Sequence, residues 1–273
     1  MAILIFRFLK MEQSMPPNKK MSPTQRRKAL LQLVIENGTI KINDAAQKLD
    51  VSPVTVYRDV QTLEEMRTLL RTNGELRAYP TSTSEMPPEL RSAQAIPEKQ
   101  ALCAAAAKLI NPGDAILLDD SSTALPIVDM LQEVSPLAVI SNSLTVFEKI
   151  KGKDGIQPVL IGGRYVEWAN AFYGSLATTL LRELQADICF TSDAAVSLSA
   201  TYNPIDYVVD FKRAMFAASK KKVLLADHQK FSRSAFQVTA LLSEFDYIVV
   251  DRQVPKDILA GMRESGCDIL LAE

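Results

Sequence analysis

Short apolar runs recur through most of the chain, and their spacing constrains the fold more than any other feature of the sequence. The runs cover residues 115–118, 137–140, 158–161, 187–190, 222–226, 247–250 and 268–271. Most of them are separated by segments of helical length, such as residues 175–185. Runs of this kind are typical of parallel strands that are buried on both faces. The alternation therefore predicts an α/β fold with an open, mostly parallel sheet and helices on both faces.

Residues 81–97 divide the chain into two parts. This segment reads TSTSEMPPELRSAQAIP, and it is rich in Ser, Thr and Pro without a sustained apolar period, so it predicts a linker. A sheet domain then spans residues 98–273, and a smaller domain spans residues 21–80. Residues 1–20 are expected to be disordered or to precede the true start, because Arg7 interrupts their apolar stretch and no cleavage site for a signal peptide surrounds it.

The charge of the chain divides at the same place. Residues 1–80 hold 13 Lys and Arg against 8 Asp and Glu, whereas the remaining residues hold 18 against 24. The small part therefore carries about +5 and the large part about −6, although the whole chain has a net charge of only −1. A basic N-terminal part favours a polyanion such as DNA as its partner.

The small domain has the order helix, short helix, tight turn, helix. Ser22 and Pro23 are suited to the first turn of the first helix, and Gly38 is suited to end it. Asn43 is the expected cap of the second helix. The pattern predicts a helix-turn-helix motif at about residues 40–59, whose third helix would enter the major groove. A three-helix interaction module with a solvated charged face is the alternative.

The third helix has one apolar and one polar face. Ser52 and Pro53 open it, and Val56, Val60 and Leu63 define its buried side. After it, Asn-Gly at 73–74 predicts the turn of a hairpin that would bring Arg71 and Arg77 near the phosphate backbone. The outward face of the helix carries the side chains expected to reach DNA, which are Thr55, Arg58 and Gln61 with Tyr57 at the flank. Ser52 and Pro53 at the start of the helix and Arg71 on the hairpin complete the set of candidates.

Polar residues follow several predicted strands, where ligands bind in open α/β sheets. Hydroxyls near helix starts and glycines that admit close backbone approach favour a phosphate, and carboxylates favour the hydroxyls of a polyol. The sequence therefore predicts a site for a polyol phosphate, although such loops often merely cap helices or form turns. The candidates from this pattern are residues 119–123, 141–143, 162–164 and 227–230, together with Asp193, Asp210 and Lys212.

Cysteine and histidine usage argues against several kinds of site. Cys103, Cys189 and Cys267 are odd in number and lack Cys-x-x-Cys spacing, so we expect reduced thiols in a cytoplasmic protein. His228 is the only histidine, so neither a metal site nor a His-dependent triad is predicted. No apolar run approaches the length of a membrane span, so we expect no membrane partner.

The motifs of both parts resemble the DeoR family of transcriptional regulators. VSPVTVYRDVQTLEE, followed by Arg71 and Asn73-Gly74, is similar to that family's winged helix-turn-helix. GDAILLDDSSTA, VISNSLTV, VLIGGRY, FYGS, DFKRAMFAASKKKVLLADHQKF and FDYIVVD occur in the order of its sugar-phosphate sensor domain, which is related to ribose-5-phosphate isomerase. The resemblance covers about residues 21–251. It implies DNA contacts from Ser52, Thr55 and Arg58. It implies effector contacts from Asp119, Ser121, Ser122, Thr123, Asn142, Ser143, Gly162, Gly163, Lys212, Asp227 and Lys230.

The sequence departs from the family pattern at a few positions. Tyr57 replaces the first Arg of an Arg pair, and Asn73-Gly74-Glu75 replaces His-Gly-Gly in the hairpin. Ala195 replaces a glycine, and Asp210 replaces a glutamate. We therefore expect base recognition and the choice of phosphosugar to differ from those of a typical member.

The expected function is that of a DNA-binding transcriptional regulator, a repressor of carbohydrate-metabolism genes that a phosphorylated sugar controls. A homodimer or tetramer is expected, because paired helix-turn-helix units read symmetric half-sites, and no cofactor is expected. One alternative is a sugar-phosphate isomerase-like enzyme, in which Asp119, Asp120, Asp193 and Lys212 would supply the acid and the base. The other alternative is a transcriptional activator, or a regulator that needs no small ligand.

Overall fold

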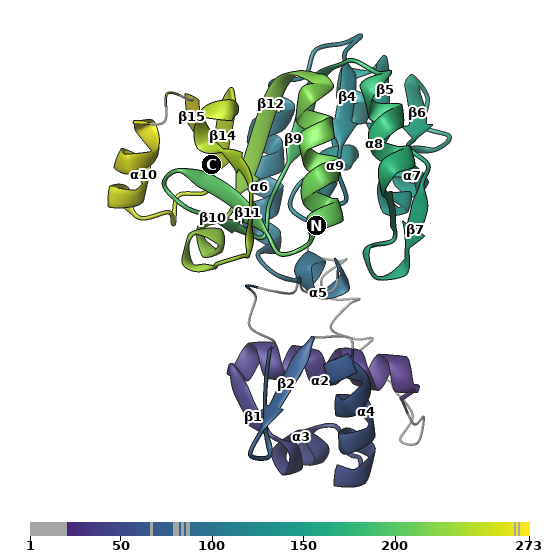
Figure 1. Ribbon diagram of the computed structural model, residues 1–273, viewed down its shortest axis with the longest axis vertical. Coiled ribbons are helices and arrows are strands. Elements are labelled where there is room, and N and C mark those ends of the chain that lie inside the picture. Colours follow the sequence, from purple (N-terminus) through teal and green to yellow (C-terminus); the bar gives the residue numbers. More distant parts are fainter. Residues whose placement is uncertain are drawn as a thin grey trace, which may run out of the picture. The chain divides into compact units, whose positions relative to one another are not determined.

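The computed structural model describes residues 21–65, 68–78, 82, 85, 88–264, 266 and 268–273 (Figure 1). These residues belong to two compact units, of which the first ends at Tyr79 and the second begins at Pro80. The predictions for residues 1–20 and for Cys267 lie outside the described residues. No helix within the described ranges is long and apolar enough to cross a membrane.

The first unit begins with α2 (Pro23–Asn37), which has a capping box at its start. The Ser22 Oγ accepts a hydrogen bond from the Gln25 N–H, and the Gln25 side chain accepts one from the Ser22 N–H. Gly38 ends the helix at φ 70°. The following elements are β1 (Thr39–Lys41), α3 (Ile42–Lys48), α4 (Pro53–Glu65), β2 (Leu69–Thr72) and β3 (Glu75–Ala78).

The predicted cap of α3 was wrong. Asn43 lies inside the helix, and Lys41, the last residue of β1, occupies the N-cap position with an extended backbone and no side-chain cap. The strand leads directly into the helix without a loop. The Ile42 N–H, the first of the helix, donates to the Gly74 carbonyl of the hairpin at 3.1 Å. The hairpin carbonyl thus accepts a hydrogen bond from an N–H group at the start of the helix, a bond that a local cap would otherwise accept.

The predicted hairpin forms, and it packs on the helices of this unit. β1, β3 and β2 make an antiparallel sheet in that order, and Asn73 (φ 52°) and Gly74 (φ 78°) make the turn between β2 and β3. Positive φ at both turn residues is the geometry that Asn-Gly favours. The most buried side chains of the unit come from the helices and the hairpin and include Leu30, Val34, Val56, Val60, Leu69 and Leu76.

The second unit is built on a parallel sheet, which confirms the predicted fold class. Within the described ranges, seven strands are hydrogen-bonded in the order β15-β14-β12-β9-β4-β5-β6, and every pair is parallel. The strands are β4 (Ala115–Leu118), β5 (Leu137–Ser141), β6 (Ile156–Leu160), β9 (Ala186–Thr191), β12 (Ser219–Ala226), β14 (Tyr247–Val250) and β15 (Asp268–Leu271).

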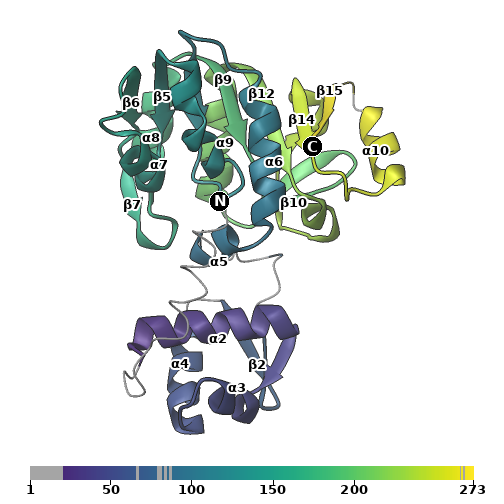
Figure 2. The same cartoon turned by 180° about the vertical axis from the view of Figure 1, so that it is seen from behind.

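Helices cover both faces of this sheet (Figures 1 and 2). α8 (Ser175–Arg182) and α9 (Asp206–Ala217) pack on one face with α10 (Lys256–Arg263), and α6 (Ile96–Ala107) and α7 (Leu144–Ile150) pack on the other. Cys103 and Cys189 are free and buried in these two cores, and burial raises the pKa of each thiol to about 12. The 3₁₀ segments are η1 (Leu125–Asp129), η2 (Leu131–Val134), η3 (Glu167–Ala169), η4 (His228–Ser232) and η5 (Leu242–Glu244).

Several short elements have no counterpart in the sequence-based prediction. β10 (Ala195–Val196), β11 (Ala200–Asn203) and β13 (Gln237–Leu241) form a small antiparallel sheet, and β7 (Arg164–Val166) pairs with β8 (Ala171–Tyr173). The segment predicted as a linker, residues 81–97, contains α5 (Pro88–Ala93) and the first residues of α6.

The strand order places a crevice between β4 and β9. From β4 the chain proceeds through β5 to β6 at one edge, and it then returns to β9 and proceeds through β12 to the other edge. Neighbouring strands whose connections lead in opposite directions leave an opening at their carboxyl ends. The residues that follow β4 and β9 are therefore in position to line a ligand pocket.

Candidate functional site

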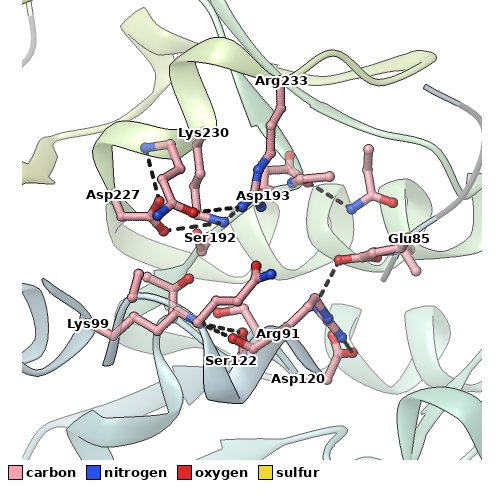
Figure 3. Close-up of a pocket in the computed structure, with 18 of the residues that line it drawn as sticks. Glu85, Arg91, Lys99, Asp120, Ser122, Ser192, Asp193, Asp227, Lys230 and Arg233 are labelled. Atoms are coloured by element: carbon pink, nitrogen blue, oxygen red, sulfur yellow. Dashed lines mark hydrogen bonds and ion pairs between the residues drawn. The ribbon is translucent and has the colours of Figure 1, made fainter. Parts of the chain in front are cut away.

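A pocket lies at this opening (Figure 3). It is lined by the residues after β4 and β9, by the segment after β12, and by residues that precede or begin α6. The lining consists of Glu85, Arg91, Gln94, Ala95, Lys99, Asp120, Ser121, Ser122, Thr123, Ser192, Asp193, Ala194, Asn203, Val208, Lys212, Asp227, Gln229, Lys230 and Arg233.

A buried ion pair lies beneath the pocket, and of its two residues Lys212 reaches the lining. The Lys212 ammonium on α9 contacts the Asp119 carboxylate and also donates to the Thr191 Oγ1 at 3.0 Å and to the Ser192 carbonyl at 2.6 Å. Burial by itself would raise the pKa of Asp119, but the charge and hydrogen bond of Lys212 hold that pKa below its ordinary value. All three N–H groups of Lys212 are thus engaged within the protein, and the residue holds the strand ends together.

Asp119 also organises the loop that follows β4. Its Oδ1 accepts from the Ser121 N–H at 2.9 Å, and the Ser121 Oγ accepts from the Ala124 N–H at 3.1 Å. Asp119 itself is not among the lining residues, since its carboxylate faces Lys212 and Thr191. The buried carboxylate therefore sets the position of the Ser121–Thr123 loop without facing the pocket.

Two further lysines face the pocket, and the hydrogen-bonding capacity of their ammonium groups is not filled by the described residues. Lys99 Nζ donates to the Ser122 Oγ at 3.2 Å and to the Arg91 carbonyl, and Lys230 Nζ donates to the Asp193 carbonyl at 2.7 Å. Burial and the charge of Lys230 lower the pKa of Lys99 to about 8, and burial lowers the pKa of Lys230. The nearest carboxylate that pairs with Lys230 is Asp227, at 4.0 Å. The two ammonium groups would therefore be stabilised by a bound anion.

Arg91 pairs with two carboxylates at the opposite wall of the pocket. Its Nη1 donates to the Glu85 Oε1 at 2.8 Å, and its Nη2 lies 3.5 Å from the Asp120 Oδ2 (Figure 3). Burial raises the pKa of Glu85 although Arg91 acts to lower it. Glu85, Arg91 and Lys99 were not among the residues predicted from the sequence. The signals were charged residues within a Ser/Thr/Pro-rich segment and a lysine at the start of an Ala-rich helix.

Four of the predicted effector residues lie away from this pocket. The Asn142 amide donates to the Phe172 carbonyl at 3.0 Å, and the Ser143 Oγ caps α7 by accepting from the Val146 N–H. A Cβ on Gly163 would lie 2.7 Å from the Tyr173 carbonyl, and Gly162 adjoins this glycine. β5 and β6 lie on the side of β4 remote from β9, so their ends approach the β7–β8 hairpin instead. The structure brings together Ser121, Ser122, Thr123, Lys212, Asp227 and Lys230.

In the first unit, the residues predicted to contact DNA lie at the start of α4 and on the hairpin. Ser52 caps the helix, since its Oγ accepts from the Thr55 N–H at 3.2 Å. Pro53 and Arg58 are exposed, and Tyr57 is 44% exposed. The Arg71 guanidinium lies 5.4 Å from the centroid of the Tyr57 ring and 3.5 Å from Glu64. These contacts join the hairpin to the outer side of α4.

The fold and the pocket together define a class of protein: a winged helix-turn-helix unit joined to an α/β unit with a ligand pocket. Comparison with protein families agrees with this description. Residues 26–81 match the DeoR-like helix-turn-helix domain, and residues 94–252 match the DeoR C terminal sensor domain. The chain belongs to the DeoR family, as its motifs indicated. The family consists of transcriptional regulators rather than enzymes, and its two domains bind DNA and an effector.

Individual relatives match over nearly the whole chain. The transcriptional repressor AccR of Agrobacterium fabrum is 30% identical over 84% of this chain and 90% of its own length. The glycerol-3-phosphate regulon repressor of Escherichia coli K12 is 25% identical over 88% of this chain and 95% of its own length. Among solved structures, ribose 5-phosphate isomerase A from Neisseria gonorrhoeae matches at a TM-score of 0.36 and 16% identity. That match covers 49% of this chain and 52% of the isomerase.

Proposed function

We propose that this regulator is a repressor of carbohydrate-metabolism genes and that a phosphorylated sugar in the pocket controls its binding to operator DNA. The observation that carries the proposal is the pair of buried ammonium groups, Lys99 and Lys230, beside the Ser121–Thr123 loop. A phosphate monoester is close to a dianion at neutral pH and accepts several hydrogen bonds, which is what these groups lack. The regulon of the glycerol-3-phosphate relative is named for a phosphate ester of similar chemistry.

The rest of the pocket suits the other end of such a ligand. Sugar hydroxyls donate hydrogen bonds, and Asp120, Asp193 and Asp227 supply carboxylate oxygens at the lining. In this proposal Lys230 binds the phosphate with Lys99 and the serine loop, while Asp119 and Lys212 hold the strand ends. Asn142, Ser143, Gly162 and Gly163 support the neighbouring hairpin and helix.

On the DNA side, we assign α4 to the major groove. Thr55, Tyr57 and Arg58 would meet base edges, while Ser52, Pro53 and Arg71 would meet the sugar-phosphate backbone. A homodimer or tetramer would place two such helices on symmetric half-sites. The ligand controls occupancy only through a difference in its affinity for the DNA-competent and DNA-incompetent arrangements. Activation instead of repression would follow from the same linkage with the opposite sign.

A fluorescence anisotropy titration tests the proposal. The purified protein is titrated onto labelled DNA from upstream of its own gene, with and without a panel of phosphorylated sugars. We expect specific binding that one phosphosugar releases, and we expect Lys230→Ala to bind DNA normally while losing that response. Lys108→Ala, which alters an exposed lysine at the end of α6, is the control and should respond as the unaltered protein does. Specific binding that no phosphosugar affects would refute the proposed effector class.

A further inference from the structure

α5 is the described helix that follows the DNA-binding unit most closely in the sequence, and it forms part of the pocket wall. The first unit ends at Tyr79 and α5 begins at Pro88, so only a short stretch of chain joins them. Arg91 on this helix lines the pocket together with Glu85, which lies between the two elements in the sequence. α5 is therefore the described element of the pocket wall that lies nearest in the sequence to the DNA-binding unit.

Contacts from pocket residues hold α5 in place. The Arg91 guanidinium reaches the Glu85 carboxylate at 2.8 Å and the Asp120 carboxylate at 3.5 Å. The backbone carbonyl of the same residue accepts a hydrogen bond from the Lys99 ammonium. Asp120 and Lys99 belong to the sheet unit and face the space where a ligand would lie (Figure 3). The groups that fix α5 are thus the groups that a ligand would meet.

The guanidinium of Arg91 is incompletely satisfied in this arrangement. The Arg91 side chain is only 14% exposed. Within the described part of the chain, neither its Nε nor its Nη2 has a hydrogen-bond partner. Buried polar groups almost always have partners, and a buried charged donor without one is costly. An anionic or polyol ligand can supply the missing acceptors from the pocket side.

We propose that α5 is a latch: the ligand takes over Arg91 from Glu85 and Asp120, and the resulting release of α5 alters DNA binding by the unit to which it is joined. The inference rests on the proposed function, since it assumes both an anionic ligand and DNA binding. The exchange is favoured because an anionic ligand anywhere in this pocket attracts the guanidinium and repels the two carboxylates that hold it. Ligand and carboxylates compete for one cation, which makes the ligand's affinity differ between the latched and released states.

Glu85→Gln tests the latch without a ligand. The substitution keeps the size of the side chain but removes the charge that holds Arg91. We expect faster hydrogen–deuterium exchange in residues 88–99 and a shift in operator affinity of about 5-fold or more, the size of a typical allosteric coupling. Glu183→Gln, a matched change at an exposed glutamate after α8, should alter neither quantity.

The outcomes separate the latch from the function on which it rests. Absence of specific operator binding by the unaltered protein would overturn the proposed function and the latch with it. Specific binding by the unaltered protein, together with faster exchange in Glu85→Gln but unchanged operator affinity, would overturn the latch alone. Unchanged exchange would also overturn it, since Glu85 would then not hold α5. Calorimetry with inorganic phosphate adds a second readout: Glu85→Gln should bind phosphate more tightly than the unaltered protein, and weaker binding would contradict the competition.

Discussion

At the scale of single residues, the three lysines of the pocket have two kinds of environment. Lys212 meets the Asp119 carboxylate, whose charge outweighs burial and raises the pKa of this lysine above its ordinary value. Burial lowers the pKa values of Lys99 and Lys230, whose nearest partners are carbonyl and hydroxyl oxygens. The same side chain is therefore structural in one place and available to an anion in the others.

The lowered pKa of Lys99 makes anion binding depend on pH. Below pH 8 the ammonium is charged, and above pH 8 it loses its proton, so phosphate affinity should fall as the pH rises through about 8. A phosphate monoester has its second pKa at about 6, so the ligand itself does not titrate in this range. Calorimetry at pH 7 and pH 9 measures the change, and proton uptake on binding near pH 8 should accompany it. Lys99→Met should bind more weakly at pH 7 and lose this dependence; a variant with an unchanged profile would assign the titration to another group.

Arg58 is the exposed cation on α4 that we assign to a base. Arg58→Ala should weaken specific operator binding by about 1–3 kcal/mol, because a bidentate arginine contact to guanine contributes about that much discrimination. Competition binding with operator and random DNA distinguishes the two roles of this side chain. An equal loss on both would place Arg58 on a phosphate instead.

At the scale of elements, one ion pair joins the two long helices of the small unit. Asp59 on α4 is 5% exposed, and it pairs with Arg26 on α2, whose Nη2 donates to the Asp59 Oδ1 at 3.0 Å. The hydrogen bond that the Arg26 guanidinium donates to Asp59 raises the pKa of Arg26. The candidate DNA contacts lie on the outer face of α4, and the orientation of that face depends on how the inner side packs against α2. The pair therefore fixes the inner side of the helix that carries candidate DNA contacts.

Asp59→Ala should destabilise the small unit by about 3 kcal/mol, since it leaves Arg26 half-buried without its carboxylate. Urea unfolding, followed through hydrogen exchange of the α2 and α4 amides, measures the loss. Asp44→Ala, at an exposed position in the first turn of α3, serves as the comparison and should change stability by less than about 0.5 kcal/mol. Equal effects of the two substitutions would mean that the ion pair contributes little.

At the scale of the whole molecule, the charge of the chain is divided between its two functions. The small unit carries the excess of basic residues, and the sheet unit carries an acidic excess whose pocket concentrates buried cations. A polyanion is therefore attracted to one unit and repelled by most of the other, whereas a small anion can enter the pocket.

DNA binding should accordingly weaken steeply with salt. Each phosphate that the protein neutralises contributes about 0.9 to the slope of log affinity against log salt concentration. Anisotropy titrations between 50 and 200 mM salt, about the range over which such losses are large, give this slope. Lys220→Ala, in the sheet unit, should leave it unchanged. A flat salt dependence would argue against the DNA-binding surface assigned to α4 and the hairpin.

The sequence by itself determined the strands of the large sheet and the most local turns and caps. Buried parallel strands require nearly continuous apolar runs, so all seven strands of the sheet could be located before their neighbours were known. The Asn73-Gly74 turn and the caps at Ser22 and Ser52 are equally local, because their hydrogen bonds join residues at most three positions apart. The strands of the small antiparallel sheet were missed because they are short and their pairing partners are distant. The cap of α3 was misassigned because a hairpin carbonyl serves its first N–H group.

Only the tertiary structure decided which strand ends share a pocket. Asp119 and Asn142 follow successive strands and look alike in the sequence, yet the strand order places β4 beside β9 and turns the end of β5 toward another hairpin. Lys99, Arg91 and Glu85 join the pocket from segments that carry no ligand motif. Their roles follow from long-range packing. Burial destabilises the charged form of a side chain, and the partners that packing brings to it decide whether it remains charged. Neither quantity can be calculated from neighbours in the sequence, because the interacting groups are brought together only when the sheet forms.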